Sequence, residues 1–354
     1  MKKKIIQTLG DLMKYKTIEG NSKDFDRAFD YIKKEVSKTL FLVEYKFKNQ
    51  KALVISNVKE KVLDIIFCTH IDIVPADNYE MKISDDVIFG RGTFDMKGSL
   101  SVLLNLFNNL KTDKKVALFI TSDEEVDGYS AMKLLKIYKT NLAIIPDGGS
   151  NFDLIVEEKG LLQLKLSIKT KAAHAAELYK GENALIKLIK IYEELIIKYP
   201  LPKSETEYIT SINLSKLEGG DALNKVPDYG EMILDIRYTS KDNVEDIINY
   251  IKSLNKKVVV QTIGFGPLFK TKINEEIKRY IKICEMVLRK EIQIKTSSMV
   301  SDAVYFSNLN IPTIIMNPVG GNAHGPEEYV TLSSLIKLYK IYEKFLKKEV
   351  KKWI

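Results

Sequence analysis

Three acids stand side by side in the segment TSDEEVDG, residues 121–128, directly after the apolar run VALFI. Repulsion between Asp123, Glu124 and Glu125 and their partial burial both raise the cost of ionising them. A divalent cation bound among them would remove that cost, because it neutralises the negative charge. Neighbouring glutamates must diverge, so one of Glu124 and Glu125 can bind the cation while the other stays free as a proton acceptor.

Polar residues also follow three other apolar runs of the chain. VLDIIF is followed by His70 and Asp72, LAII by Asp147, and IPTIIM by His324. The chain has only three histidines, the third being His174. A single histidine is most simply a hydrogen-bonded core or surface residue. Imidazoles grouped with carboxylates, however, are typical ligands of zinc and related metals, so this set of residues predicts a metal centre.

The spacing of His70 and Asp72 places both side chains on one face of an extended strand. His70 can then bind a metal while Asp72 accepts the proton of its other ring nitrogen. The Gly-flanked segment FGRGTFDMKG adds Asp95 just before a helix. Paired divalent ions sharing one carboxylate would polarise a carbonyl group and lower the pKa of water.

Buried strands and alternating helices are expected to position these groups. Near-continuous apolar runs at 62–67, 116–120, 142–145 and 311–316 are typical of strands buried on both faces. Helical patterns at 97–110 and 129–138 lie between them, which predicts an α/β fold with a mostly parallel sheet flanked by helices. Such sheets bind ligands outside the carboxyl ends of their strands, where the polar residues occur.

The middle of the chain follows a different pattern. From about 160 to 264 the order is strand, helix, two strands, helix, strand, which is the βαββαβ unit of ferredoxin-like domains. The α/β pattern resumes after it. We therefore predict a metal-binding catalytic domain formed by residues 1–158 and 266–354, with residues 159–265 inserted into it.

Composition narrows the classes of partner. A net charge of +8 permits nucleic-acid binding, but the lysines are scattered and no aromatic residues are interleaved with them, so no nucleic-acid partner is expected. No window reaches the roughly 18 apolar residues of a membrane span, and Asp11 interrupts the start where a signal peptide would be apolar. Cys68 and Cys284 form no secreted-type framework. We expect a cytoplasmic protein that does not bind membranes.

Several motifs together resemble one enzyme family. The chain contains, in order, HIDIVP, GRGTFDMKG, TSDEEVDG, IPDGG, AHAAELYKGENA, NKVPDYGEMILDIR and AHGPEEYV. These are similar to segments of the dinuclear zinc hydrolases that include succinyl-diaminopimelate desuccinylase, acetylornithine deacetylase, aminoacylase and carboxypeptidase G. The resemblance covers nearly the whole chain. It implies a zinc-exopeptidase-like catalytic domain and an inserted lid that forms a homodimer.

The resemblance also implies a set of metal ligands. Asp95 corresponds to the ligand that bridges two divalent ions. His70 and Asp147 correspond to the remaining ligands of one ion, and Glu125 and His324 to those of the other. Zinc is the expected metal, with cobalt or manganese as alternatives.

Further roles follow from the same resemblance. Glu124 corresponds to the general base that takes a proton from the attacking water and passes it to the leaving amine. His174 resembles the residue that stabilises the oxyanion in a neighbouring subunit's site. Arg237 and Asn224 resemble the pair that holds the substrate carboxylate, although an ion pair of Arg237 with Asp235 is the simpler interpretation of that arginine.

The predicted function is metal-dependent hydrolysis of the amide in a small N-acyl amino acid, by a desuccinylase or deacetylase. A dipeptidase of the same family is the alternative. A noncatalytic metal-binding or interaction protein is the alternative from another class, and it would be expected to lack Glu124 or a ligand. Around His174 the sequences KAAHAA and ELYKG depart from the family's usual glycine and proline, which bears on the shape of that loop.

Overall fold

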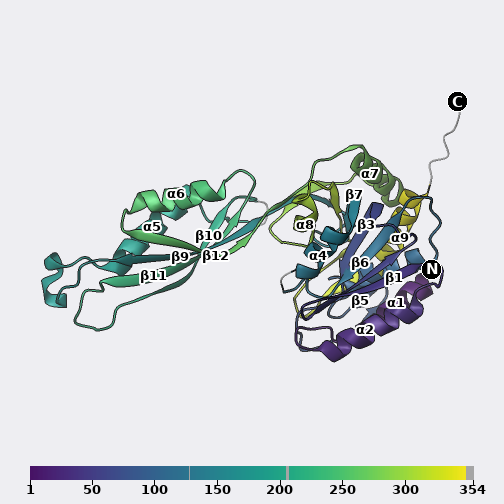
Figure 1. Ribbon diagram of the computed structural model, residues 1–354, viewed down its shortest axis with the longest axis horizontal. Coiled ribbons are helices and arrows are strands. Elements are labelled where there is room, and N and C mark those ends of the chain that lie inside the picture. The colour runs from purple at the N-terminus through teal and green to yellow at the C-terminus, as the bar shows by residue number, and fades with distance from the viewer. Residues whose placement is uncertain (127, 205–206, 348–354) are drawn as a thin grey trace. The chain divides into compact units, whose positions relative to one another are not determined.

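The computed structural model describes residues 1–126, 128–204 and 207–347 (Figure 1). The chain divides into two compact units. The first comprises Met1–Val156, Thr271–Lys295 and Ser301–Ile354, and the second Glu157–Lys270 and Thr296–Val300. Each unit has its own hydrophobic core.

The centre of unit 1 is a sheet whose middle strands are parallel. These are β6 (Val116–Thr121), β3 (Val62–His70), β7 (Lys139–Ile145) and β15 (Thr313–Ile315), in that order. All residues of β6 and most of β3 are buried, as strands covered on both faces must be. The predicted α/β class with a mostly parallel sheet core is thus confirmed.

Antiparallel strands extend this sheet on both sides. On one side β2 (Gln50–Ser56) pairs with β6, and β1 (Phe41–Phe47) pairs with β2. On the other side β8 (Leu154–Glu158) pairs with β15, and β14 (Ile294–Ser297) with β8. Glu157 and Glu158, the last residues of β8, belong to unit 2 and pair with β13 (Phe269–Lys270) of the same unit. The whole sheet is therefore mixed.

Helices cover both faces of the central strands. On one face lie α1 (Lys2–Met13), α2 (Ser22–Glu35), α3 (Lys97–Asn108), α7 (Glu275–Leu288) and α9 (Leu332–Leu346). Phe67 of β3 packs there in edge contacts with Phe107 of α3 and Tyr342 of α9. On the other face lie α4 (Tyr129–Ile137) and α8 (Ala303–Ser307). The helices cover the faces of the sheet, and loops follow the carboxyl ends of the parallel strands.

A small antiparallel sheet lies within unit 1 beside those loops. It contains β16 (Gly320–Gly321), β17 (Tyr329–Thr331), β5 (Val87–Phe89) and β4 (Lys82–Ser84), in that order. β17 pairs with β5, which brings the segment after residue 320 next to the segment before residue 92. Two loops far apart in the sequence are thereby joined.

Unit 2 has the strand and helix order of a ferredoxin-like domain. Its elements are β9 (Gly160–Lys169), the 3₁₀ helix η1 (Ala175–Lys180), α5 (Ala184–Lys198), β10 (Ser211–Gly219), β11 (Tyr229–Tyr238), α6 (Val244–Leu254) and β12 (Val258–Gly266). The antiparallel strand order is β10-β11-β9-β12. Buried and half-buried residues alternate along β9 and β11, as expected for a sheet with helices on one face.

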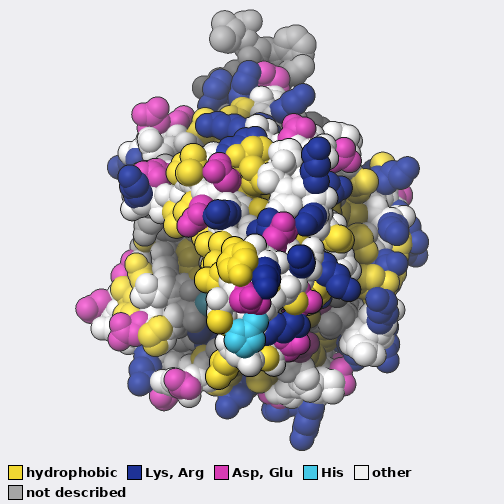
Figure 2. All heavy atoms as spheres, turned by 90° about the vertical axis from the view of Figure 1, so that its left-hand side faces the viewer, with side chains coloured by type: hydrophobic (Ala, Val, Ile, Leu, Met, Phe, Trp, Pro, Cys, Tyr) yellow, Lys and Arg dark blue, Asp and Glu magenta, His cyan; other side chains and the backbone are white. Residues whose placement is uncertain are grey.

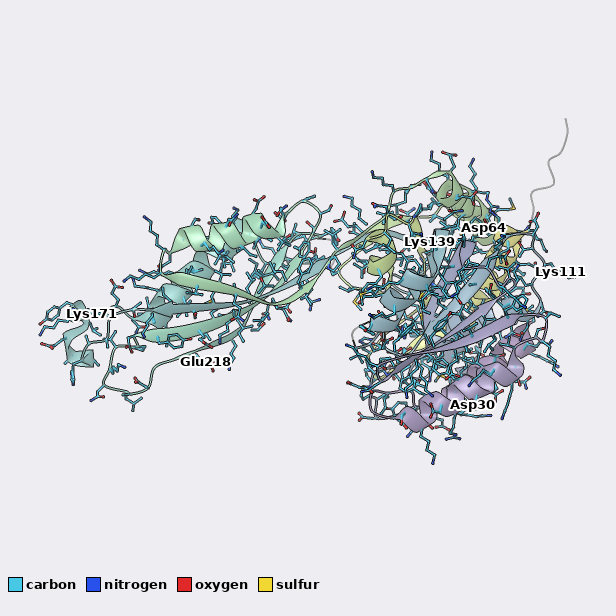
Figure 3. The ribbon with its side chains drawn as sticks, viewed as in Figure 1. Asp30, Asp64, Lys111, Lys139, Lys171 and Glu218 are labelled. Carbon is cyan, nitrogen blue, oxygen red and sulfur yellow. The ribbon has the colours of Figure 1, made fainter. Side chains whose placement is uncertain are left out.

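Charged side chains of both signs are distributed over both units. Figure 3 labels Asp30, Asp64, Lys111 and Lys139 on unit 1 and Lys171 and Glu218 on unit 2. On the face seen in Figure 2, basic and acidic side chains are intermingled with hydrophobic ones. Among the described residues, no helix combines the length and apolar character that a bilayer span requires.

Candidate metal centre

The five candidate ligands and the candidate base Glu124 gather at the carboxyl edge of the parallel strands. His70 is the last residue of β3, Glu124 and Glu125 lie just beyond β6, and Asp147 lies just beyond β7. Asp95 ends the loop before α3, and His324 lies in the loop between β16 and β17. All six belong to unit 1. Strand order alone explains the approach of the first four, because the carboxyl ends of neighbouring parallel strands share one edge.

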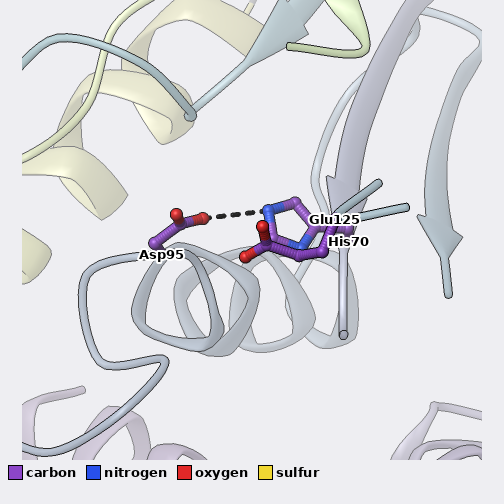
Figure 4. Close-up of side chains that lie close together, drawn as sticks. All are labelled: His70, Asp95 and Glu125. Carbon is purple, nitrogen blue, oxygen red and sulfur yellow. Dashed lines mark hydrogen bonds and ion pairs between the residues drawn. The ribbon is translucent and has the colours of Figure 1, made fainter. Parts of the chain in front are cut away.

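Asp95 lies between the two imidazoles. Its Oδ1 is 3.0 Å from Nε2 of His70, the contact drawn in Figure 4, and its Oδ2 is 3.2 Å from Nε2 of His324. One carboxylate thus presents one oxygen to each histidine. This is the arrangement that a carboxylate shared by two metal ions would have.

The other carboxylates are grouped around the same two histidines. Nε2 of His324 is 3.1 Å from Glu125, while Nε2 of His70 is 3.9 Å from Asp147 and 4.0 Å from Glu124. In each of two sets of side chains, the potential ligand atoms all lie within 4.8 Å of one another. One set is His70, Asp95 and Glu125, and the other is His70, Glu124 and Asp147. The structure therefore brings together every metal ligand predicted in the sequence, as well as Glu124.

Asp72 supports this group from behind. Its Oδ2 accepts a hydrogen bond of 2.9 Å from the backbone N–H of Glu125. Nδ1 of His70 is 3.0 Å from the backbone carbonyl of Asp72 and 3.5 Å from its Oδ1. The carbonyl is therefore the nearer acceptor of the ring proton, where the sequence had suggested the carboxylate. Either acceptor leaves Nε2 directed at the cluster.

Burial shifts the pKa values of two of these acids, Glu124 and Asp147, upward. Burial raises the pKa of Glu124 well above its ordinary value, and Asp147 and Asp302 add to this rise while His70 opposes it. Burial, with the charge of Asp95, raises the pKa of Asp147 to about 7. These carboxyl groups carry a free-energy cost of ionisation that a bound cation would offset.

The histidines compensate part of this negative charge. Burial alone would lower the pKa of His70, but its hydrogen bonds to Asp72 and Asp95 hold the pKa well above the ordinary value. Hydrogen bonds to Asp95 and Glu125 raise the pKa of His324 to about 10. Metal ions and protons compete for these nitrogens, since only a neutral imidazole can bind a metal.

The residues fit a divalent metal centre. Imidazole nitrogens and carboxylate oxygens are the donor set of zinc, cobalt and manganese sites. Oδ1 of Asp72 is buried without a hydrogen-bond partner, a cost that is tolerated where positive charge lies close by. The acids described above gather on buried strand ends, and a cation would neutralise them.

Three of the predicted residues belong to unit 2. His174 precedes η1, and its Nδ1 accepts a hydrogen bond of 3.1 Å from the N–H of Ala176. The carbonyl of Asn224 accepts a hydrogen bond from the N–H of Ala175, so Asn224 lies beside this turn. With Nδ1 acting as acceptor, the ring proton of a neutral His174 is on Nε2, which is available to donate to an anion.

Arg237 is paired within the sheet of unit 2. Its Nε donates to Oδ1 of Asp235 at 2.8 Å. This is the ion pair with Asp235 that was the simpler interpretation of this arginine. The side chain of Arg237 is 42% exposed, however, and the pair with Asp235 uses Nε and Nη2 but not Nη1. Lys159 is buried, and burial is the main cause of its lowered pKa. The nearby positive charge of Arg237 lowers this pKa further. Unit 2 thus carries two neighbouring cations.

The sequence analysis missed three polar residues of unit 1. Asp302 is 4% exposed, and its Oδ2 accepts a hydrogen bond of 3.4 Å from Thr121 at the end of β6. Burial, with the charge of Asp123, raises its pKa well above the ordinary value. The other two, Arg91 and Glu328, form a buried ion pair.

Comparison with known proteins agrees with this geometry. Histidines and acids grouped at the carboxyl edge of parallel strands suit a metal-dependent hydrolase of amide or peptide bonds. The chain belongs to Peptidase family M20/M25/M40, which matches residues 66–348. The resemblance to the zinc hydrolases inferred from the motifs is confirmed.

Relatives and solved structures match almost the full chain. It is 29% identical to a succinyl-diaminopimelate desuccinylase of Rickettsia felis and 28% identical to that of Rickettsia akari, over 96% of this chain and 98% of each relative. The fold is similar to aminopeptidase PepT of Bacillus cereus, with a TM-score of 0.79 at 19% identity, covering 98% of both chains. It is also similar to the metallo-carboxypeptidase Sso-CP2 of Sulfolobus solfataricus, with a TM-score of 0.72 at 20% identity, covering 97% of this chain and 98% of that one.

Proposed function

We propose that the protein hydrolyses the amide of a small N-acyl amino acid that has a free carboxylate, with a succinyl or acetyl group as the acyl part. The observation that carries the proposal is the position of Asp95, with one oxygen 3.0 Å from His70 and the other 3.2 Å from His324. Two divalent ions, most suitably zinc, would share Asp95. His70 and Asp147 would hold one ion, and Glu125 and His324 the other.

The residues of the chain would divide the work of hydrolysis. Bound cations would supply the positive charge that polarises the amide carbonyl and lowers the pKa of water. Glu124 would accept a proton from the attacking water and deliver it to the departing nitrogen. Its raised pKa suits this task, because the carboxyl group must hold the proton between the two steps. Asp72 would keep His70 and the backbone of Glu125 in position.

Recognition of the substrate carboxylate would fall to unit 2. Arg237 offers the Nη1 side of a planar donor, and Lys159 adds a second positive charge nearby. Asn224 would contribute an amide donor. The desuccinylase relatives support an N-succinyl amino acid as the first substrate to test.

A peptidase is the second candidate, because of a cavity beside the metal centre. The cavity has a volume of about 520 Å³ and lies within unit 1, between Asp72 and Glu125 on one side and the loop before α2 on the other. Its polar lining includes Glu19, Ser22, Asn49 and Gln50. Its described lining contains neither lysine nor arginine. Because Glu19 has no lysine or arginine beside it in the described lining, the cavity favours the free amine of a peptide over the carboxylate of a succinyl group.

A panel of matched substrates would distinguish these candidates. N-succinyl and N-acetyl amino acids and dipeptides are compared at equal concentration with zinc, manganese or cobalt. We expect the N-acyl amino acids to be cleaved fastest. Preferred cleavage of dipeptides, with a rise in KM of the dipeptide in Glu19→Gln, would instead establish the peptidase. Glu80→Gln, a similar change at an exposed acid outside the cavity lining, is the control.

We further propose that the protein is a cytoplasmic homodimer in which His174 serves the active site of the partner subunit. The buried free thiols of Cys68 and Cys284 suit a reducing compartment. The exposed side chain of His174, with its proton on Nε2, suits donation to the oxyanion of the tetrahedral intermediate.

His174→Ala is expected to lower kcat by about 10²–10³-fold with a smaller effect on KM, because an oxyanion donor acts mainly in the transition state. Steady-state kinetics measure both constants. Lys180→Ala, an exposed residue of the same turn, should leave them unchanged. Mixing His174→Ala with Glu124→Gln subunits should restore part of the activity if His174 acts across a dimer. No restoration would mean that His174 acts within its own subunit.

A further inference from the structure

The carboxylate of Glu328 is completely surrounded by donors. It is 1% exposed, and Oε2 accepts hydrogen bonds from Nη1 of Arg91 at 2.7 Å and from the N–H of Gly92 at 2.9 Å. Its Oε1 accepts from the N–H groups of Phe94 at 2.9 Å and Asp95 at 3.0 Å. Three backbone donors and one side chain of a single loop therefore converge on one buried residue, and the last of them belongs to Asp95.

The same network reaches the loop that carries His324. Nη2 of Arg91 donates to the carbonyl of Gly325 at 3.1 Å, next to His324 in the chain. The backbone carbonyl of Glu328 accepts from the N–H of Gly90 at 2.9 Å, where β5 meets β17. The ion pair of Arg91 and Glu328 thus ties the loop ending at Asp95 to the loop containing His324.

The backbone of the first loop depends on these bonds. Gly92 has a φ of 86°, which other residues rarely adopt, and a side chain there would approach Ile73 to 2.8 Å. Residues 91–95 form no regular element apart from turns. Because neither a helix nor a strand fixes this loop, the carboxylate of Glu328 takes the place of a regular hydrogen-bond ladder.

We propose that Glu328, together with Arg91, is a positioning residue that sets Asp95 and His324 at the spacing needed to bind divalent metal. The inference rests on the proposed function insofar as these two residues are metal ligands. The carboxylate of Glu328 binds the guanidinium of Arg91 and three backbone N–H groups. It acts through the backbone of Asp95 and, by way of Arg91, through the loop of His324.

The substitution Glu328→Gln tests this role with little change in shape. A carboxylate accepts on both oxygens, whereas an amide accepts only on one and presents N–H groups on the other. Whichever way the amide turns, two of the four donors lose their acceptor. We expect the affinity for zinc to fall about 10–100-fold, the range seen when residues behind metal ligands are changed. Hydrolysis should recover when zinc is added in excess, with KM unchanged.

Glu157→Gln is the matched control. Glu157 is also a buried glutamate, and it accepts hydrogen bonds from the N–H of Ser240 at 2.9 Å and its hydroxyl at 2.7 Å. Its partners belong to unit 2 and include no candidate ligand. The change should lower the unfolding temperature without altering zinc affinity. If Glu328 only stabilised the fold, Glu328→Gln would likewise lower the unfolding temperature and leave zinc affinity unchanged. The reason is that zinc affinity measured on folded protein does not depend on the free energy of unfolding.

The measurement is zinc titration of the metal-free full-length protein at 25 °C, with circular dichroism confirming that each variant is folded. Unchanged zinc affinity in folded Glu328→Gln, or an equal loss in Glu157→Gln, would overturn the inference. If Glu328→Gln does not fold, Arg91→Lys decides, because lysine keeps the charge but cannot reach both Glu328 and Gly325 with a planar fork. Its zinc affinity should fall, and an unchanged value overturns the inference. Failure of the unaltered protein to bind zinc would instead refute the proposed function.

Discussion

Glu124→Gln is expected to lower the rate of hydrolysis by about 10²–10⁴-fold while leaving metal binding intact, because the change removes proton transfer and little else. Glutamine has nearly the same shape as glutamate but cannot accept a proton. The nearest histidine nitrogen, Nε2 of His70, is 4.0 Å from Glu124, whereas Glu125 is 3.1 Å from His324. Glu125 is thus in direct contact with one of the candidate histidine ligands, and the resemblance assigns Glu124 the role of the base that stays free of metal.

Glu125→Gln is the matched comparison. The same substitution one residue later replaces a proposed charged ligand, so bound metal should decrease and activity should depend on added zinc. The backbone N–H of Glu125 is held by Asp72 and is unaffected by this change. Metal content by elemental analysis and initial rates at a series of zinc concentrations distinguish the two variants. If Glu124→Gln loses metal and Glu125→Gln keeps it, the two glutamates have exchanged roles.

The central strands could be predicted because burial on both faces leaves a plain signal. VALFI and VLDIIF are apolar without interruption, and the strands β6 and β3 are buried accordingly. The antiparallel strand β2 was missed although its segment ALVI carries the same signal and is buried. β1 alternates exposed and half-buried residues, which gives no comparable pattern. The strands of the small sheet have only two or three residues, too few for any periodicity.

The candidate ligands were found for the same reason that the strands were. Most of them immediately follow an apolar run, so locating the strand ends also located the ligands. Arg91 and Glu328 lie 237 positions apart in the sequence, and no local pattern indicates their contact. Asp302 likewise accepts a hydrogen bond from Thr121, which lies 181 positions away in the sequence. Residues that support a site from other segments are defined by tertiary structure, which one sequence does not reveal.

Removal of bound metal by a chelator is expected to abolish hydrolysis and to lower the stability of unit 1 selectively. All candidate ligands lie in unit 1, and without a cation the charges of Asp95, Glu124 and Asp147 oppose one another. Ligand present at 100 times its dissociation constant stabilises the folded state by about 2.7 kcal/mol, and chelation removes that contribution.

Differential scanning calorimetry before and after dialysis against a chelator measures this effect. We expect the transition of unit 1 to fall by several degrees while that of unit 2 stays in place, because unit 2 contributes none of the candidate ligands. Zinc, cobalt or manganese should restore both the transition and the activity. Magnesium is the control, since it prefers oxygen ligands and the site presents the nitrogens of His70 and His324. Full activity in protein shown to be free of metal, or an equal shift of both transitions, would contradict a metal centre formed by the five candidate ligands of unit 1.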